Sequence, residues 1–395
     1  MNNRLRSISI NSVVQVAFII WFISDFLSKI AFKDDTLKEI ISSIDKSINI
    51  IVLLLLIAVI FLLKYSYSQL VMIAIVSILI ITSAVLSGYN SLLSAWLFII
   101  ASKNVDFKEL VKRVYYLTVV LIPFVLLSSI IGITNNIQFY RFPSMKLRSS
   151  MGFDHPNTLG QRIFQLWMFI VFLKNGSLKV YDYIFLLLSI VFVAYIPNSQ
   201  AAYMSLLIVL VIVSIYGLMK KHTNNGRELL CNACIYTTVI IVLLSIILSL
   251  IDLKRYHFLY LIDTIMGKRF SVCYRDYQLF GISIWGQKVY TTLEERKIAG
   301  INEVLFLDNA YMAILLRFGI VVFAIFICAY IYNMIYQKNK NSIITIIFFL
   351  YAIYGVFENG IYIASYNVFL ITISSLLFNN ADQKKFKILF SSIRH

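Results

Sequence analysis

The chain has 395 residues, of which 60% are hydrophobic and 14% charged, and its mean hydropathy is +0.83. Soluble domains average about 45–50% apolar and about 25% charged residues, so this composition excludes an ordinary soluble protein. The net charge of +16 suits an anionic membrane leaflet, and we expect a lipid bilayer and no nucleic acid as a partner.

Long apolar runs predict an all-α, polytopic membrane protein, with residues 1–395 forming a single integral membrane domain. Because a helix needs about 20 apolar residues to cross the hydrocarbon core, the runs indicate about twelve transmembrane helices. The predicted spans are residues 11–31, 48–63, 69–86, 91–102, 114–134, 158–173, 181–196, 201–219, 232–251, 309–336, 342–357 and 361–378.

The charges between these spans predict the orientation of the chain. Short cytoplasmic loops collect Lys and Arg. If the N-terminus is cytoplasmic, every inner connection is basic, whereas the short outer connections, such as KDDTLKEIISSIDK, SGYN and ENG, are neutral or acidic. We therefore expect both termini to be cytoplasmic.

Two outer connections are long and basic. Residues 135–157 carry a net charge of +2, and residues 253–307 carry +3. Cations on the outer face oppose this topology, and an anionic ligand would explain their presence. The alternative is two solvated loops with incidental charge. The larger loop also contains HFLYLIDTIM and YQLFGISIWG, which predict short interfacial helices.

The segment RSSMGFDHPNTLGQR gathers polar residues where the first of these loops meets an apolar run. Pro156 suits the first turn of a helix, which places His155 at or next to the N-cap. Helix N-termini attract anions such as phosphates. Arg162 is costly inside a bilayer unless it faces a polar interior, and Arg148 could fold over the same place. The segment indicates a diphosphate site beside an imidazole, or else a capped helix with snorkelling arginines.

Two further polar groups are predicted at outer helix ends. LDNAYMAILLRFG places Asp308, Asn309 and Tyr311 where the span 309–336 begins, with Arg317 about two turns deeper. GVFENG places Glu358 at the end of the span 342–357. Either carboxylate could be a general base for a hydroxyl group, and either could instead cap or end a helix.

No motif for a metal or a nucleotide is present: the sequence lacks D-x-D, H-E-x-x-H and a P-loop. Cys231 and Cys234 form a lone C-x-x-C. We interpret them as two small residues at the start of a helix, which is a simpler explanation than a metal site. We expect no cofactor and no metal.

These residues resemble a known family. RSSMGFDHPNTLG resembles the R-x-S-x-G-[small]-H-P-N-x-x-G signature of Wzy-type polymerases of capsular, exopolysaccharide and O-antigen-like glycans, a family related to the O-antigen ligases. LDNAYMAILLRFGI and GKRFSVCYRDYQLFGISIWG are similar to two later elements of that family. The resemblance covers essentially the whole chain. Asp154 departs from it, because a small residue is usual there, and Asp154 could pair with Arg148 or His155.

The resemblance implies a metal-independent, inverting glycosyltransferase of the bacterial cytoplasmic membrane, with its active site facing outward. Such an enzyme transfers a growing glycan from polyprenyl diphosphate to a sugar hydroxyl of a lipid-linked repeat unit. Its partners would be the lipid-linked donor and acceptor, a co-polymerase that regulates chain length, and a flippase. The alternatives are an O-antigen-ligase-like transferase, a flippase or transporter of lipid-linked sugars, and a membrane scaffold.

With this function, roles follow for ten residues. We expect the diphosphate to be bound by Arg148, Arg162 and Arg269, with Arg317 as a further candidate. The acceptor proton would be taken by His155 or Glu358, between which the sequence gives no ranking. The sugar or the loop would be positioned by Asp308, which is also a candidate catalytic carboxylate, and by Asn157, Asn309 and Tyr311.

Overall fold

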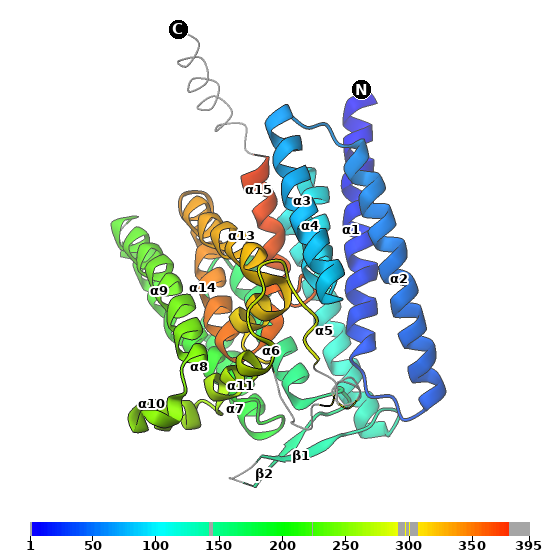
Figure 1. Ribbon diagram of the computed structural model, residues 1–395. Helices are drawn as coiled ribbons and strands as arrows, with labels where there is room; N and C mark the ends of the chain where they lie inside the picture. The colour runs from blue at the N-terminus through cyan, green and yellow to red at the C-terminus, as the bar shows by residue number, and fades with distance from the viewer. Residues whose placement is uncertain are drawn as a thin grey trace.

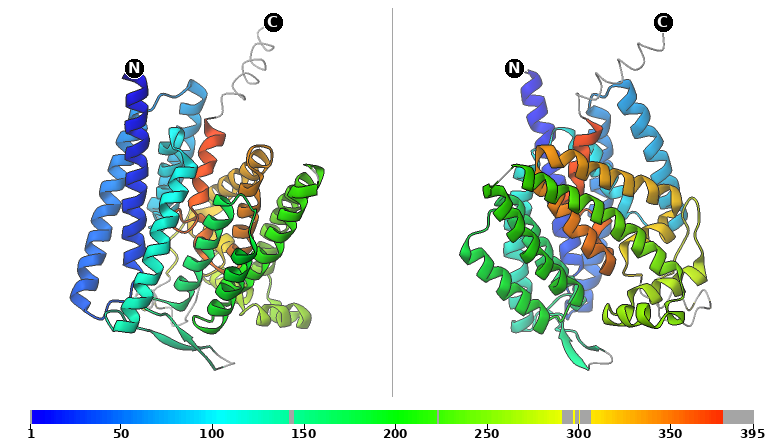
Figure 2. Two further views of the ribbon diagram at one scale, coloured as in Figure 1. Left: turned by 180° about the vertical axis from the view of Figure 1, so that it is seen from behind. Right: turned by 90° about the vertical axis from the view of Figure 1, so that its left-hand side faces the viewer.

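The computed structural model describes residues 2–141, 145–222, 224–290, 297, 300 and 307–378. Most of these residues are helical, and the long helices are arranged as a bundle (Figure 1). The start of α1 and the short helix α15 lie at one end of the bundle, whereas the only described strands and α10 lie at the other (Figures 1 and 2). We call the second end the hairpin end.

The helices appear in the order that the apolar runs predict. Their bounds are α1 Asn2–Ser28, α2 Asp35–Leu62, α3 Tyr67–Ser87, α4 Ser91–Ala101, α5 Phe107–Ile131, α6 Pro156–Leu173, α7 Val180–Tyr195, α8 Gln200–His222, α9 Asn224–Leu250, α10 His257–Ile265, α11 Arg269–Phe280, α13 Ala310–Lys340, α14 Ser342–Phe357 and α15 Ser374–Leu377. Short 3-10 helices are η1 Ser102–Asn104, η2 Leu253–Arg255, η3 Asn359–Tyr362 and η4 Val368–Ile373.

Within the described residues, seven helices are long and apolar enough to cross a membrane: α1, α2, α3, α5, α8, α9 and α13. This confirms a largely helical, membrane-embedded protein. The other predicted spans are shorter or less apolar: α4 has 11 residues, α7 and α14 have 16 each, and α6 begins with polar turns that include Arg162. The structure corrects the last predicted span, since 361–378 is not one continuous helix.

Helix α14 is central to the bundle. It packs against α6, α8, α9 and α13, and nearly all of its side chains are buried. The sequence of α14, SIITIIFFLYAIYGVF, is apolar on every face. Such a helix is stable only where other elements surround it. Phe164 of α6 stacks on Tyr354 of α14, with ring centroids 4.4 Å apart, and fixes these two helices side by side.

The first long outer loop folds into a β-hairpin, which the all-α prediction did not include. Strands β1 (Gln138–Arg141) and β2 (Lys146–Ser149) are antiparallel, with Gln138 opposite Ser149. The strands have four residues each, too short for periodicity to be recognised in the sequence. The hairpin delivers Arg148 to the beginning of α6.

The second long outer loop contains η2, α10 and α11. Helix α10 exposes Phe258, Leu261 and Ile265, as expected for a helix that lies at an interface. Asp263 accepts hydrogen bonds from the backbone N–H groups of Phe270 (2.9 Å) and Ser271 (3.1 Å), and so caps α11.

Helix α13 is broken at Gly319, where φ is +81°. The groups freed by the break pair with the outer loop: the N–H of Ile320 donates to Ser283 O (3.0 Å), and the N–H of Gln287 donates to Arg317 O (2.9 Å). A Cβ at Gly319 would lie 2.5 Å from backbone atoms of that loop, so glycine is required there. Broken helices are tolerated at membrane depth when protein satisfies the free backbone groups.

Candidate functional site

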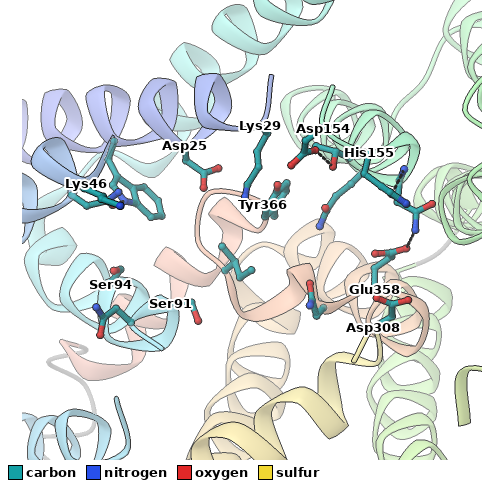
Figure 3. A pocket seen from close by; sticks show the side chains of 18 of the residues that line it. Asp25, Lys29, Lys46, Ser91, Ser94, Asp154, His155, Asp308, Glu358 and Tyr366 are labelled. Carbon is teal, nitrogen blue, oxygen red and sulfur yellow. Dashed lines mark hydrogen bonds between the residues drawn. The ribbon is translucent and has the colours of Figure 1, made fainter. Parts of the chain in front are cut away.

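A cavity of about 1030 Å³ lies at the hairpin end of the bundle, and Figure 3 shows its lining. Its side chains come from segments far apart in sequence. One group, which we call the α6 end, consists of Arg148, His155, Asn157, Arg269, Asp308 and Glu358. A second group, which we call the α1–α2 end, consists of Lys29, Lys46, Asn90, Ser91 and Ser94. Tyr366 lies between the two groups.

All six residues of the α6 end are among those predicted from the sequence. Arg148 enters from β2, where its Nε donates to Pro197 O (3.2 Å) and its Nη2 donates to the Asn157 side-chain oxygen. Asn157 in turn donates from Nδ2 to Glu358 Oε1 at 2.6 Å. Asn157 therefore links the arginine of the hairpin to the carboxylate that ends α14.

Arg269 completes the network from the other side. As the first residue of α11, it is held in place by the Asp263 cap on that helix. Its Nη1 is ion-paired with Asp308, and its Nη2 lies 3.6 Å from Glu358 Oε1. Two arginines and two carboxylates thus converge around Asn157, with no net charge among the four.

His155 is the N-cap of α6, with Pro156 in the first turn, as the sequence predicts. Its Nδ1 accepts the N–H of Asn157 at 3.1 Å, so the neutral ring must carry its proton on Nε2. Burial, together with the nearby Arg148 and Arg269 guanidinium groups, lowers the pKa of His155 to about 4. His155 is a weak base in this position and acts as a cap.

The carboxylate of Asp154 interacts with the backbone of His155, whereas no ion pair joins it to Arg148 or to the His155 imidazole. Its Oδ1 accepts the Thr158 hydroxyl at 2.7 Å, a contact one turn into α6. Asp154 also lines the cavity, between the α6 end and Lys29 (Figure 3).

Arg162 lies outside the cavity lining, so its expected role in binding a diphosphate needs correction. The side chain is fully buried, pairs with Asp25 Oδ2 at 2.8 Å, and stacks on the Tyr366 ring at 4.1 Å. Its Nη1 donates to Ser365 O at 3.0 Å, in the unwound segment between η3 and η4. The Arg162 guanidinium thus donates to the Ser365 carbonyl, which lies outside any helix and has no helical hydrogen-bond partner.

Gln165 supports the same unwound segment, donating to Ser365 O (2.7 Å) and Tyr366 O (3.0 Å). The polar stripe at the start of α6 thus holds open the break in the predicted span 361–378. A Cβ at Gly360 would lie 1.9 Å from Gln161 Nε2, beside the cavity, so any larger residue there would require the Gln161 side chain to move.

Three more predicted residues are buried away from the cavity. Arg317 stacks on the Tyr89 ring at 4.3 Å and donates to the Tyr362 hydroxyl at 3.1 Å. Asn309 caps α13 and donates to Ser245 Oγ at 2.6 Å. The Tyr311 hydroxyl donates to Ala352 O at 2.7 Å. These contacts fix α13 against its neighbours, and the three residues are not part of the cavity lining.

The sequence did not single out the α1–α2 end. Lys46 belongs to an outer connection in which the acidic residues outnumber the basic ones, so the net charge of the connection gave no sign of a cation site there. Helix α2 begins at Asp35, well before the predicted span at 48, because Asp34 caps it by accepting the N–H of Thr36. Lys46, Asn49 and Leu53 are spaced so that they share one face of a helix, and all three line the cavity. This spacing is the sequence feature from which the face could have been predicted.

The comparisons with known proteins give no match: no protein-family model, no curated protein and no solved structure is similar to this chain. Among the described residues, no three His, Cys, Asp or Glu side chains are grouped as ligands for a metal ion. The site is therefore interpreted from its own geometry.

Proposed function

We propose that the protein is a polysaccharide polymerase that transfers a glycan from polyprenyl diphosphate to a sugar hydroxyl of a lipid-linked repeat unit. The observation that carries the proposal is the network at the α6 end. Five segments of an otherwise apolar protein bring Arg148, Arg269, Asp308 and Glu358 to one polar cavity around Asn157.

The proposed roles follow from the contacts. Arg148 and Arg269 lie on either side of the Asn157–Glu358 pair and would bind the two phosphates, whose negative charge grows as the leaving group departs. Glu358 would be the general base, because the Nδ1 lone pair of His155 is already used by a backbone N–H. Asp308 holds Arg269 and Asn157 orients Glu358.

In the proposed reaction, the acceptor hydroxyl oxygen attacks the anomeric carbon of the donor sugar. Its O–H proton passes to Glu358, the carbon–oxygen bond to the diphosphate breaks, and polyprenyl diphosphate leaves with the electron pair. A single displacement inverts the anomeric centre. No metal or cofactor has a step in this scheme.

We propose the cytoplasmic membrane of a bacterium as the location, with twelve spans and both termini in the cytoplasm. The hairpin end would then face outward, where flipped lipid-linked substrates are found. A flippase would supply them, and a co-polymerase would set the chain length. The seven long apolar helices support a membrane location.

The test is reconstitution of the purified protein in liposomes with lipid-linked repeat units, followed by separation of the glycans by length. Wild-type protein is expected to give a ladder, and Glu358→Gln is expected to give none, because the amide cannot take a proton. Glu39→Gln is the matched control, since Glu39 is an exposed acidic residue of α2 outside the cavity lining.

Each of the other results would replace the proposal. Translocation of the substrate without elongation would indicate a flippase. Transfer of finished chains to a different acceptor would indicate a ligase. A normal ladder from Glu358→Gln would remove Glu358 as the base.

A further inference from the structure

The two ends of the cavity differ in how their charges are paired. At the α6 end, each charged side chain contacts an opposite charge or an amide. At the α1–α2 end, the described side chains of Lys29, Lys46, Asn90, Ser91 and Ser94 make no hydrogen bond or ion pair with one another or with any other residue of the structure. The lining holds four cations and four carboxylates, and Lys29 and Lys46 are the two cations whose side chains make no direct ion pair or hydrogen bond among the described residues.

The acidic residues near these lysines are already engaged. Asp25 is paired with Arg162 at 2.8 Å, and Asp45 accepts the Ser24 hydroxyl at 2.6 Å. Asp154 is adjacent to Lys29, since its N–H donates to Lys29 O at 2.9 Å, and the two side-chain charges interact without forming an ion pair. Lys46 and the hydroxyls of Ser91 and Ser94 line this end of the cavity, and Lys29 lies further along it beside Tyr366, with Asp25 between the two lysines (Figure 3).

An exposed apolar stripe leads along α2 from this end. Ile50, which is 60% exposed, lines the cavity. It is followed on the same face by Leu54 (62% exposed), Ile57 (40%) and Phe61 (84%). Lys46 lies one turn before Ile50 on that face. A cation at the outer end of an apolar stripe is complementary to a lipid with an anionic headgroup.

We infer that the α1–α2 end binds the diphosphate of a second polyprenyl-linked substrate, the acceptor, with its prenyl chain along α2. The inference rests on the proposed function, in which two lipid-linked substrates meet in one cavity. The glycan of the acceptor would run from Lys29 and Lys46, past Tyr366, to Glu358. The attacking hydroxyl lies at the far end of the acceptor glycan from its own diphosphate, so two separated phosphate sites are required.

The experiment measures binding of radiolabelled farnesyl diphosphate to the full chain in phosphatidylcholine nanodiscs. We expect two bound equivalents for the wild type and one for Lys29→Gln/Lys46→Gln at the same ligand concentration. The affinity of the lost site should fall about tenfold for each lysine removed, as expected for one charge-assisted hydrogen bond. Lys29→Arg/Lys46→Arg should keep both equivalents.

The matched control is Lys33→Gln/Lys38→Gln, which changes two lysines of the same region that do not line the cavity. It should bind two equivalents. The unfolding temperature of each variant is measured as well, and it should match that of the wild type. Lys29→Arg/Lys46→Arg keeps both positive charges, so its binding separates a loss of charge from a loss of folding.

Arg148→Gln separates this inference from the proposed function. If Arg148→Gln loses one equivalent and Lys29→Gln/Lys46→Gln loses none, the second site is wrong and the proposed donor site stands. If only the lysine variant loses an equivalent, the lysine site stands and the proposed donor site is wrong. Displacement from the lysine site by added phosphatidylglycerol would show a general anionic-lipid site and overturn the assignment to a diphosphate.

Discussion

The four arginines predicted to bind a diphosphate fall into two pairs with opposite surroundings. Arg148 and Arg269 line a cavity and contact an amide and carboxylates that also line it. Arg162 and Arg317 are buried on aromatic rings, and their partners hold the backbone or the packing of other segments. The same residue type thus lines a cavity in one pair and packs against rings in the other, and, if the cavity pair binds the proposed diphosphate, substitutions should separate the two pairs.

The largest effect is expected for the cavity pair. Arg148→Ala or Arg269→Ala should reduce the rate of polymer formation by about 10²–10³-fold, because each removes a cation from the developing charge of the leaving group. The protein level and the free energy of unfolding should change little. The measurement is the glycan ladder in reconstituted liposomes, with the exposed Arg255→Ala as the control. Normal chain lengths from Arg148→Ala would contradict the assignment.

Arg162→Met should instead destabilise the protein, by about 3–5 kcal/mol, because it leaves Asp25 without its partner and removes one of the two donors to Ser365 O. Titration with SDS from a mild detergent measures the free energy of unfolding. If the variant were as stable as the wild type and only failed to bind farnesyl diphosphate, Arg162 would belong with the cavity pair.

Arg317→Met should have a smaller effect of the same kind. The loss of the cation on the Tyr89 ring and of the donor to Tyr362 should cost about 1–2 kcal/mol. The same SDS titration measures it, and the double variant Tyr89→Leu/Arg317→Met should lose less stability than the sum of the two single variants. Additive losses would show that the two side chains do not act together.

The smallest effect concerns pH. The pKa of His155 is about 4 in the folded protein against an ordinary value of 6.5, so the unfolded chain binds more protons between these values. Stability should therefore fall as the pH is lowered from 6.5 to about 4, and should not change further from this cause below 4.

His155→Asn tests this, because an asparagine side chain can also cap α6 without titrating. The variant should lose part of the pH dependence of unfolding in that interval. His257→Asn, at an exposed histidine of the second outer loop, should retain it. An unchanged pH profile in His155→Asn would mean that the imidazole titrates normally.

Hydropathy predicted the positions of the helices because a bilayer demands long apolar runs, and no other element of this chain has them. The polar residues at the ends of those runs predicted the α6 end of the cavity, since charges are retained at membrane depth only where they have a use. Arg269 and Glu358, which are 89 positions apart in the sequence, are brought within 3.6 Å.

The breaks in the helices could not be predicted in the same way. Helix α13 can break at Gly319 because residues 283–287 of the outer loop pair with the backbone groups that the break frees. The segment at Ser365 can be unwound because Arg162 and Gln165 donate hydrogen bonds to its carbonyl. Such partners are tertiary and leave no local pattern. The same reason explains why the two arginine pairs looked alike in sequence.

The contacts of Arg162 also constrain how the protein is made. Its carboxylate partner belongs to the first helix, whereas its carbonyl partner at Ser365 lies near the end of the chain. During synthesis, α6 enters the membrane with Asp25 already present, but it must wait for some two hundred further residues before the last partner arrives. A chain that stops before Ser365 would therefore leave Arg162 without its carbonyl partner.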